Sequence, residues 1–196
     1  MKRSISLLLI AVFILSSCSY LNRIAESVDK KLSAIGKDTR KEDEALRRKV
    51  ERLLGKMDYE GALVLIKRAT RDGKPEIFFG DSYVKAIEGI SKKGIKYYNS
   101  EKYMSAGKTL RRAVSFMPAD KKILAEIKYS SEDLELFIED SSAHLMDRGF
   151  KEYRKGNLGY AVSVWKGILE FNPDYKDAIK AIDTATVQMK NLKKID

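Results

Sequence analysis

Residues 149–173 read GFKEYRKGNLGYAVSVWKGILEFNP, and residues 94–118 read GIKYYNSEKYMSAGKTLRRAVSFMP. The two stretches match at a constant offset, from a glycine at the start to Phe-x-Pro at the end, with a short polar turn at 100–102 and at 155–157. Small residues allow two helices to approach closely, and proline commonly follows a helix end. Each stretch therefore predicts two antiparallel helices joined by a tight turn.

A weaker copy of the same pattern lies upstream, where the turn and the second helix can be followed to Pro75. Its first helix, around residues 45–54, has Val50 in place of the glycine. Downstream, residues 175–196 carry apolar side chains at heptad-like steps and predict a helix that caps the array. No run alternates with a period of two, so a sheet is not expected. The sequence predicts an all-α fold.

These copies resemble the tetratricopeptide repeat (TPR), a helix–turn–helix unit of 34 residues. The resemblance covers two full units, about residues 87–120 and 142–175, and part of a third. Two departures stand out: Lys93 and Arg148 occupy positions where the family usually has leucine, and the copies lie farther apart than 34 residues.

The longer offsets predict extra helix between the units, such as 121–128 and 131–139. We expect about two and a half irregular TPR-like hairpins with a C-terminal capping helix, in a domain spanning 45–196.

The resemblance also implies where a partner would bind, because the first helices of TPR hairpins line a concave face. Such a groove takes a peptide segment through apolar anchors and polar groups that set its register. This face would also present Ser91 and Asp147. The candidate groove residues on it are Lys92, Ile95, Tyr98, Asn99, Met146, Phe150, Tyr153 and Arg154. The alternative is that these aromatic side chains pack against residues 175–196 or against the helices between the units.

Residues 1–18, MKRSISLLLIAVFILSSC, combine a basic start, a short apolar run and a cysteine. The apolar run is too short to span a bilayer and is typical of a secretory signal peptide. The end of this segment resembles a bacterial lipobox, which implies a signal peptide over 1–17 and lipidation of Cys18. Ser19, in place of aspartate, favours the outer membrane, with the domain facing the periplasm.

Residues 18–44 follow as the lipid anchor and its connection to the domain. An apolar stripe predicts a short amphipathic helix, formed by Leu21, Ile24, Val28, Leu32 and Ile35. The polar stretch 37–44 is interpreted either as a tether or as the solvated start of the next helix. Anchored in this way, the chain is expected in the cell envelope.

Composition excludes several classes of site. A single cysteine and a single histidine, His144, exclude a disulfide framework, a zinc finger and a multi-histidine metal cage. The formal net charge of +10 is compatible with anionic partners. Export argues against nucleic acid, which leaves phosphate-bearing lipids, wall polymers, acidic protein segments or a mixed-charge solvated surface. We expect no metal and no cofactor.

Motifs for catalysis are weak. Gly107-Lys108-Thr109 resembles the end of a phosphate-binding loop, but the glycine required five residues earlier is Lys102, so nucleotide binding is not expected. The acidic cluster from Glu132 to Asp140 lacks a glycine-pinned loop and fits the start of a helix. We expect that the protein is not an enzyme.

Three functions remain after composition and motifs are considered. The first is a membrane-anchored periplasmic protein–protein interaction scaffold or assembly factor. The second is a structural lipoprotein that associates with the cell wall or lipopolysaccharide through its basic surface. The third, a hydrolase or lytic enzyme, is disfavoured because no catalytic constellation supports it.

The lipobox yields a direct prediction. Cys18→Ala removes the thiol that would carry the lipid, so the protein should move from the membrane fraction to a soluble or uncleaved form. Membrane fractionation with labelled fatty acid checks this. Normal cleavage together with unchanged membrane association would contradict the lipoprotein hypothesis.

Overall fold

The computed structural model describes Lys30 and residues 39–192, and every regular element in them is a helix. The prediction of an all-α fold is therefore confirmed. The chain divides into two units, residues 1–49 and 50–196. Of the first unit, residues 39–49 are helical and mostly exposed. The predicted signal peptide, Cys18 and the amphipathic stripe lie outside the described residues.

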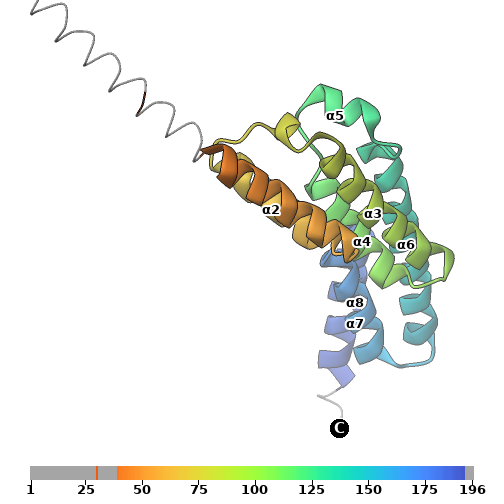
Figure 1. Ribbon diagram of the computed structural model, residues 1–196. Coiled ribbons are helices and arrows are strands. Elements are labelled where there is room, and N and C mark those ends of the chain that lie inside the picture. The colour runs from red at the N-terminus through yellow and green to blue at the C-terminus, as the bar shows by residue number, and fades with distance from the viewer. Residues whose placement is uncertain (1–29, 31–38, 193–196) are drawn as a thin grey trace, which may run out of the picture. The chain divides into compact units, whose positions relative to one another are not determined.

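In the second unit, residues 50–55 are helical. The elements that follow are α2 (Tyr59–Arg71), the 3-10 helix η1 (Glu76–Phe78), α3 (Gly80–Asn99), α4 (Tyr103–Ser115), α5 (Lys121–Glu126), α6 (Ser131–Arg154), α7 (Leu158–Leu169) and α8 (Lys176–Leu192) (Figure 1).

The helices of the second unit stack in the order of the sequence. Each packs mainly against the next, from α2 on α3 through α4, α6 and α7 to α8 (Figure 1). Lighter contacts join α3 to α6, α4 to α7 and α6 to α8, while α5 packs against η1 and α3. Such nearest-neighbour packing is the arrangement of stacked helical hairpins.

The extra residues between the hairpins mostly lengthen their first helices. α3 has 20 residues and α6 has 24, whereas α4 and α7 have 13 and 12. The predicted extra helix at 131–139 is present and forms the first part of α6. A capping box formed by Ser130 and Asp133 starts α6, and neither proline nor glycine occurs before Gly149, so nothing ends the helix earlier.

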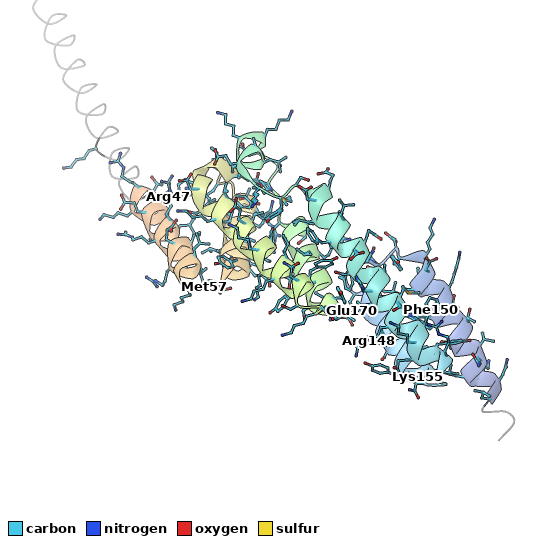
Figure 2. All side chains as sticks on the ribbon, turned by 90° about the vertical axis from the view of Figure 1, so that its right-hand side faces the viewer. Arg47, Met57, Arg148, Phe150, Lys155 and Glu170 are labelled. Carbon is cyan, nitrogen blue, oxygen red and sulfur yellow. The ribbon has the colours of Figure 1, made fainter. Side chains whose placement is uncertain are left out.

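The three hairpin turns have the same backbone geometry. Met57, Glu101 and Gly156 occupy equivalent places and have positive φ angles of 58°, 55° and 84°. In each turn the next residue donates its N–H to the carbonyl five residues earlier, at 2.9–3.0 Å, which is the Schellman pattern. The predicted turns at 100–102 and 155–157 are thus confirmed. Figure 2 shows Met57 and Lys155 beside two of these turns.

The glycines of the repeat lie where the two helices of a hairpin touch. A Cβ at Gly94 would lie 2.5 Å from Leu110 Cδ2, and one at Gly149 would lie 2.1 Å from Trp165 Nε1. Leu110 and Trp165 are themselves fully or almost fully buried. The role predicted for both glycines, close approach of paired helices, is therefore confirmed.

Successive hairpins are joined by a cation that reaches from one to the next. Lys67 of α2 donates to the Met117 carbonyl at 3.2 Å and pairs with Glu76 at 3.1 Å. At the matching position of α4, Arg111 donates to the Phe171 carbonyl at 2.7 Å and forms a two-pronged ion pair with Glu135. Each cation thus satisfies a carbonyl at the end of the following hairpin.

Glu76, the carboxylate that pairs with Lys67, accepts several hydrogen bonds. Besides Lys67, it accepts the backbone N–H groups of Ala119 and Asp120 at 2.7 and 2.8 Å. Burial raises its pKa, but the backbone donors and Lys67 more than offset burial, so the pKa lies below its ordinary value. The folded state therefore favours the charged carboxylate.

Gly149→Ala should destabilise the fold although alanine is the better helix former. We expect a loss of about 1–3 kcal/mol in the free energy of unfolding, because the added methyl group must displace the buried Trp165 ring. The matched control is Gly55→Ala, where a Cβ meets nothing within 4 Å. It should be neutral or stabilising by up to about 1 kcal/mol. Equal effects in urea denaturation would show that Gly149 is not at a tight crossing.

Glu76→Gln should lower stability at neutral pH by about 1–3 kcal/mol, because charge-assisted hydrogen bonds are lost. Since the folded-state pKa is depressed, Glu76 stabilises the fold fully above its unfolded pKa of about 4.3, and this contribution disappears as pH falls through the lower folded pKa. The free energy of unfolding should therefore fall less steeply with decreasing pH in the variant than in the wild type. Exposed Glu126→Gln serves as the control, and an identical acid limb in wild type and Glu76→Gln would contradict the assignment.

Candidate partner-binding groove

A groove lies between the second half of α6 and the start of α8, with one residue of α7 at its base. It is open to solvent and has a volume of about 570 Å³. Its lining is Ala143, Met146, Asp147, Phe150, Tyr153, Trp165, Tyr175, Asp177, Lys180, Ala181 and Thr184. The α6 members recur at three- and four-residue steps, which places them on one side of that helix.

The floor of the groove is apolar and firmly held. Met146 and Trp165 are 5% and 1% exposed, and the indole N–H of Trp165 donates to the Met146 carbonyl at 3.3 Å. The ring of Phe150 packs edge-on against Trp165, with centroids 5.2 Å apart, yet Phe150 remains 44% exposed. An exposed aromatic ring on a fixed apolar base is suited to anchoring an apolar side chain of a partner.

Polar groups surround this floor. Asp147 pairs with Lys151 at 2.6 Å, and this hydrogen bond holds the pKa of Asp147 below its ordinary value. The hydroxyl of Tyr153 donates to the side-chain carbonyl of Gln188 on α8 at 2.5 Å. The rim therefore offers charged and neutral hydrogen-bonding groups around an apolar centre, an arrangement that is common in ligand-binding clefts.

The structure separates the predicted groove residues into two sets. Met146, Phe150 and Tyr153 line the α6–α8 groove, whereas Arg154 is exposed at the end of α6 and is not part of the lining. On α3, Lys92 and Asn99 are exposed, Ile95 is half-buried and Tyr98 belongs to a different hollow. Ser91 is fully buried and donates to the Ile87 carbonyl, so it presents nothing to a partner.

This second hollow lies between the end of α3 and the first half of α6, and its volume is about 510 Å³. It is lined by Tyr98, Lys128, Tyr129, Asp133, Leu136, Phe137 and Asp140. The Tyr98 hydroxyl donates to Asp140 at 2.5 Å, and this bond, with burial second, raises the pKa of Tyr98 to about 12. Its ring packs edge-on against Phe137 at 5.0 Å.

These aromatic and apolar residues differ in how far other helices of the domain cover them. Tyr98 and Tyr153 are tied to other helices of the same domain, through Asp140 and Gln188. Phe150 and Leu136 remain exposed, at 44% and 71%. The groove is thus only partly filled by the protein itself.

Sequence reasoning missed the contribution of Trp165 to the groove, and it included α8 only through the alternative that the groove aromatics pack against residues 175–196. The segment 175–196 was expected as a solvating cap, and α8 does cover α7, but its first turns also form one wall of the groove. Leu136 was missed as well. The available signal was an apolar residue seven positions before Ala143 and fourteen before Phe150 in one predicted helical stretch.

The other sequence candidates have structural roles. Gly107-Lys108-Thr109 lies within α4, where a Cβ at Gly107 would meet the Phe171 ring at 2.4 Å. His144 stacks on Tyr103, with ring centroids 4.1 Å apart, and its Nε2 lies 3.3 Å from Asp140. Over the described part of the chain, no group of three or more His, Cys, Asp or Glu side chains is arranged to hold a metal ion.

Comparison with known protein families, with curated proteins and with solved structures found no match. Among the helices that the structure describes, none combines the length and the apolar character needed to cross a bilayer.

Proposed function

We propose that this chain is a lipid-anchored interaction protein of the cell envelope, which holds a segment of a partner protein in the α6–α8 groove. The observation that carries the proposal is the groove itself, with the exposed Phe150 ring above the buried Met146 and Trp165. Such a site binds by excluding water from an apolar anchor while its polar rim sets orientation.

The hairpin geometry supports assignment to the TPR type. Three turns with the same Schellman hydrogen bonds, and glycines at the helix crossings of two hairpins, are what the repeat pattern requires. In such an array α3, α6 and α8 are the helices that line the concave side. Both hollows lie between consecutive members of this set.

The anchor is proposed from the N-terminal segment alone. A diacylated or triacylated Cys18 would hold the domain at a membrane, since each buried CH₂ group contributes about 0.8 kcal/mol. Ser19 favours the outer membrane. The domain would then face the periplasm, where it would act as a scaffold or assembly factor for other envelope proteins.

Site-specific photo-crosslinking in cells tests this proposal. A photoreactive residue replacing Thr184, on the groove wall, should give discrete adducts with a partner protein, whereas one replacing the exposed Ser163 of α7 should not. Phe150→Ala should reduce the Thr184 adduct on the order of tenfold, because it removes the anchor. Tyr160→Ala is the control, since Tyr160 is similarly exposed at 46% but lies outside the groove.

Two outcomes would contradict the proposal. Equal adducts at positions 163 and 184 would show that the groove is not the binding site. No adducts at either position, together with wall association that weakens with salt and ignores Phe150→Ala, would favour the structural lipoprotein that acts through its basic surface.

A further inference from the structure

One side of α6 carries an alternating row of acidic and apolar residues that connects the two hollows. Aspartates recur every seven residues at 133, 140 and 147, and apolar residues recur every seven at 136, 143 and 150. The members up to 140 line the α3–α6 hollow, and the members from 143 line the α6–α8 groove. We call these six residues the α6 row.

The α6 row is exposed although it contains large apolar side chains. Leu136 is 71% exposed and Phe150 is 44% exposed, and Ala143 between them is also exposed. The six residues follow the three- and four-residue steps that place side chains on one face of a helix, with aspartate at one position of each heptad and an apolar residue at the other. Figure 2 shows Phe150 on the side of α6 toward α8, away from Arg148.

Charge distinguishes this surface from the rest of the chain. The two hollows are lined by four aspartates, Asp177 of α8 included, against two lysines, Lys128 and Lys180. The chain as a whole has a formal charge of +10. The lining of the two hollows is therefore acidic in a basic protein, which favours a basic partner and opposes self-association through these hollows.

Internal contacts hold the three aspartates of the row in place. Asp133 accepts the Ser130 backbone N–H at 2.9 Å within the capping box. Asp140 is held by Tyr98 and His144, and Asp147 is held by Lys151. Lys151 offsets part of the charge of Asp147, while Asp133 and Asp140 have no lysine or arginine among these contacts. Positioned carboxylates of this kind recognise cations at defined spacings.

We infer that the partner segment is an amphipathic helix whose seam alternates apolar and basic side chains, laid along the α6 row. This inference rests on the proposed function and specifies the chemistry of its partner. The row from 133 to 150 is about 26 Å long at 1.5 Å per residue, so a helix of roughly three heptads would cover it. Its apolar side chains would contact Leu136 and Phe150, and its Lys or Arg side chains would face Asp140 and Asp147.

A synthetic peptide tests the inference directly. The probe is a fluorescein-labelled three-heptad helix with leucine at one seam position and lysine at the other. The full chain is held in phosphatidylcholine nanodiscs, and empty nanodiscs supply the background. Fluorescence anisotropy should show saturable binding that weakens as salt rises. A peptide with glutamate in place of the seam lysines should bind at least about tenfold more weakly.

Variants of the protein separate the two components of recognition. Asp140→Asn with Asp147→Asn keeps side-chain size but removes charge, and should weaken the lysine peptide by about threefold to tenfold. Leu136→Ala with Phe150→Ala should weaken it on the order of tenfold or more. The matched control, Asp72→Asn with Asp81→Asn, removes two exposed carboxylates that line neither hollow and should have no effect.

The outcomes distinguish this inference from the proposed function. If the Thr184 adduct depends on Phe150 but lysine and glutamate peptides bind equally, the groove binds a partner and the charge preference is wrong. A probe in which a central proline breaks the helix should not bind. Equal binding of that probe would show that the partner is extended rather than helical. No binding of any peptide to the wild-type chain would overturn the inference.

Discussion

The contact between Gly149 and Trp165 is the one on which the candidate site depends. With no side chain at Gly149, α6 approaches α7 closely enough for the indole ring to lie against its backbone. The ring is then buried, its N–H meets the Met146 carbonyl, and its far edge supports Phe150. A Cβ at position 149 would lie 2.1 Å from Trp165 Nε1, so the ring that forms the floor of the groove would have to shift. The same contact therefore stabilises the hairpin and shapes the binding surface.

Contacts between successive hairpins include polar groups as well as apolar packing. Lys67 and Arg111 each cross from one hairpin to a carbonyl at the end of the next, and each is held by a carboxylate. Because hydrogen bonds are directional, these cations fix how far one hairpin rotates relative to its neighbour. The Arg111–Glu135 pair joins α4 to α6, the helix beside which both hollows lie.

The charge of the chain is distributed unevenly. For recognition, the local charge of the α6 row matters more than the net charge of the chain. A net charge of +10 favours anionic partners over the surface as a whole. On our proposal the α6 row favours the opposite sign, since its aspartates occur at heptad intervals beside exposed apolar residues. An acidic groove on a basic body would draw a basic segment only at close range, where the local carboxylates outweigh the distant lysines screened by salt.

The sequence by itself determined the all-α class, the positions of the hairpin turns and the glycines at the crossings, because these depend on local periodicity, on turn geometry and on residue size. Two copies of one pattern, at 94–118 and 149–173, were sufficient to predict these features. Only the tertiary structure decided that Tyr98 and Tyr153 border different hollows and that α8 supplies a wall of the groove. Residues on different helices are brought together by the rotation between hairpins, which depends on side-chain packing and on contacts such as Arg111 with Glu135, between positions far apart in the chain. No local pattern encodes that rotation, so the sequence predicted the helices but not the cavity between them.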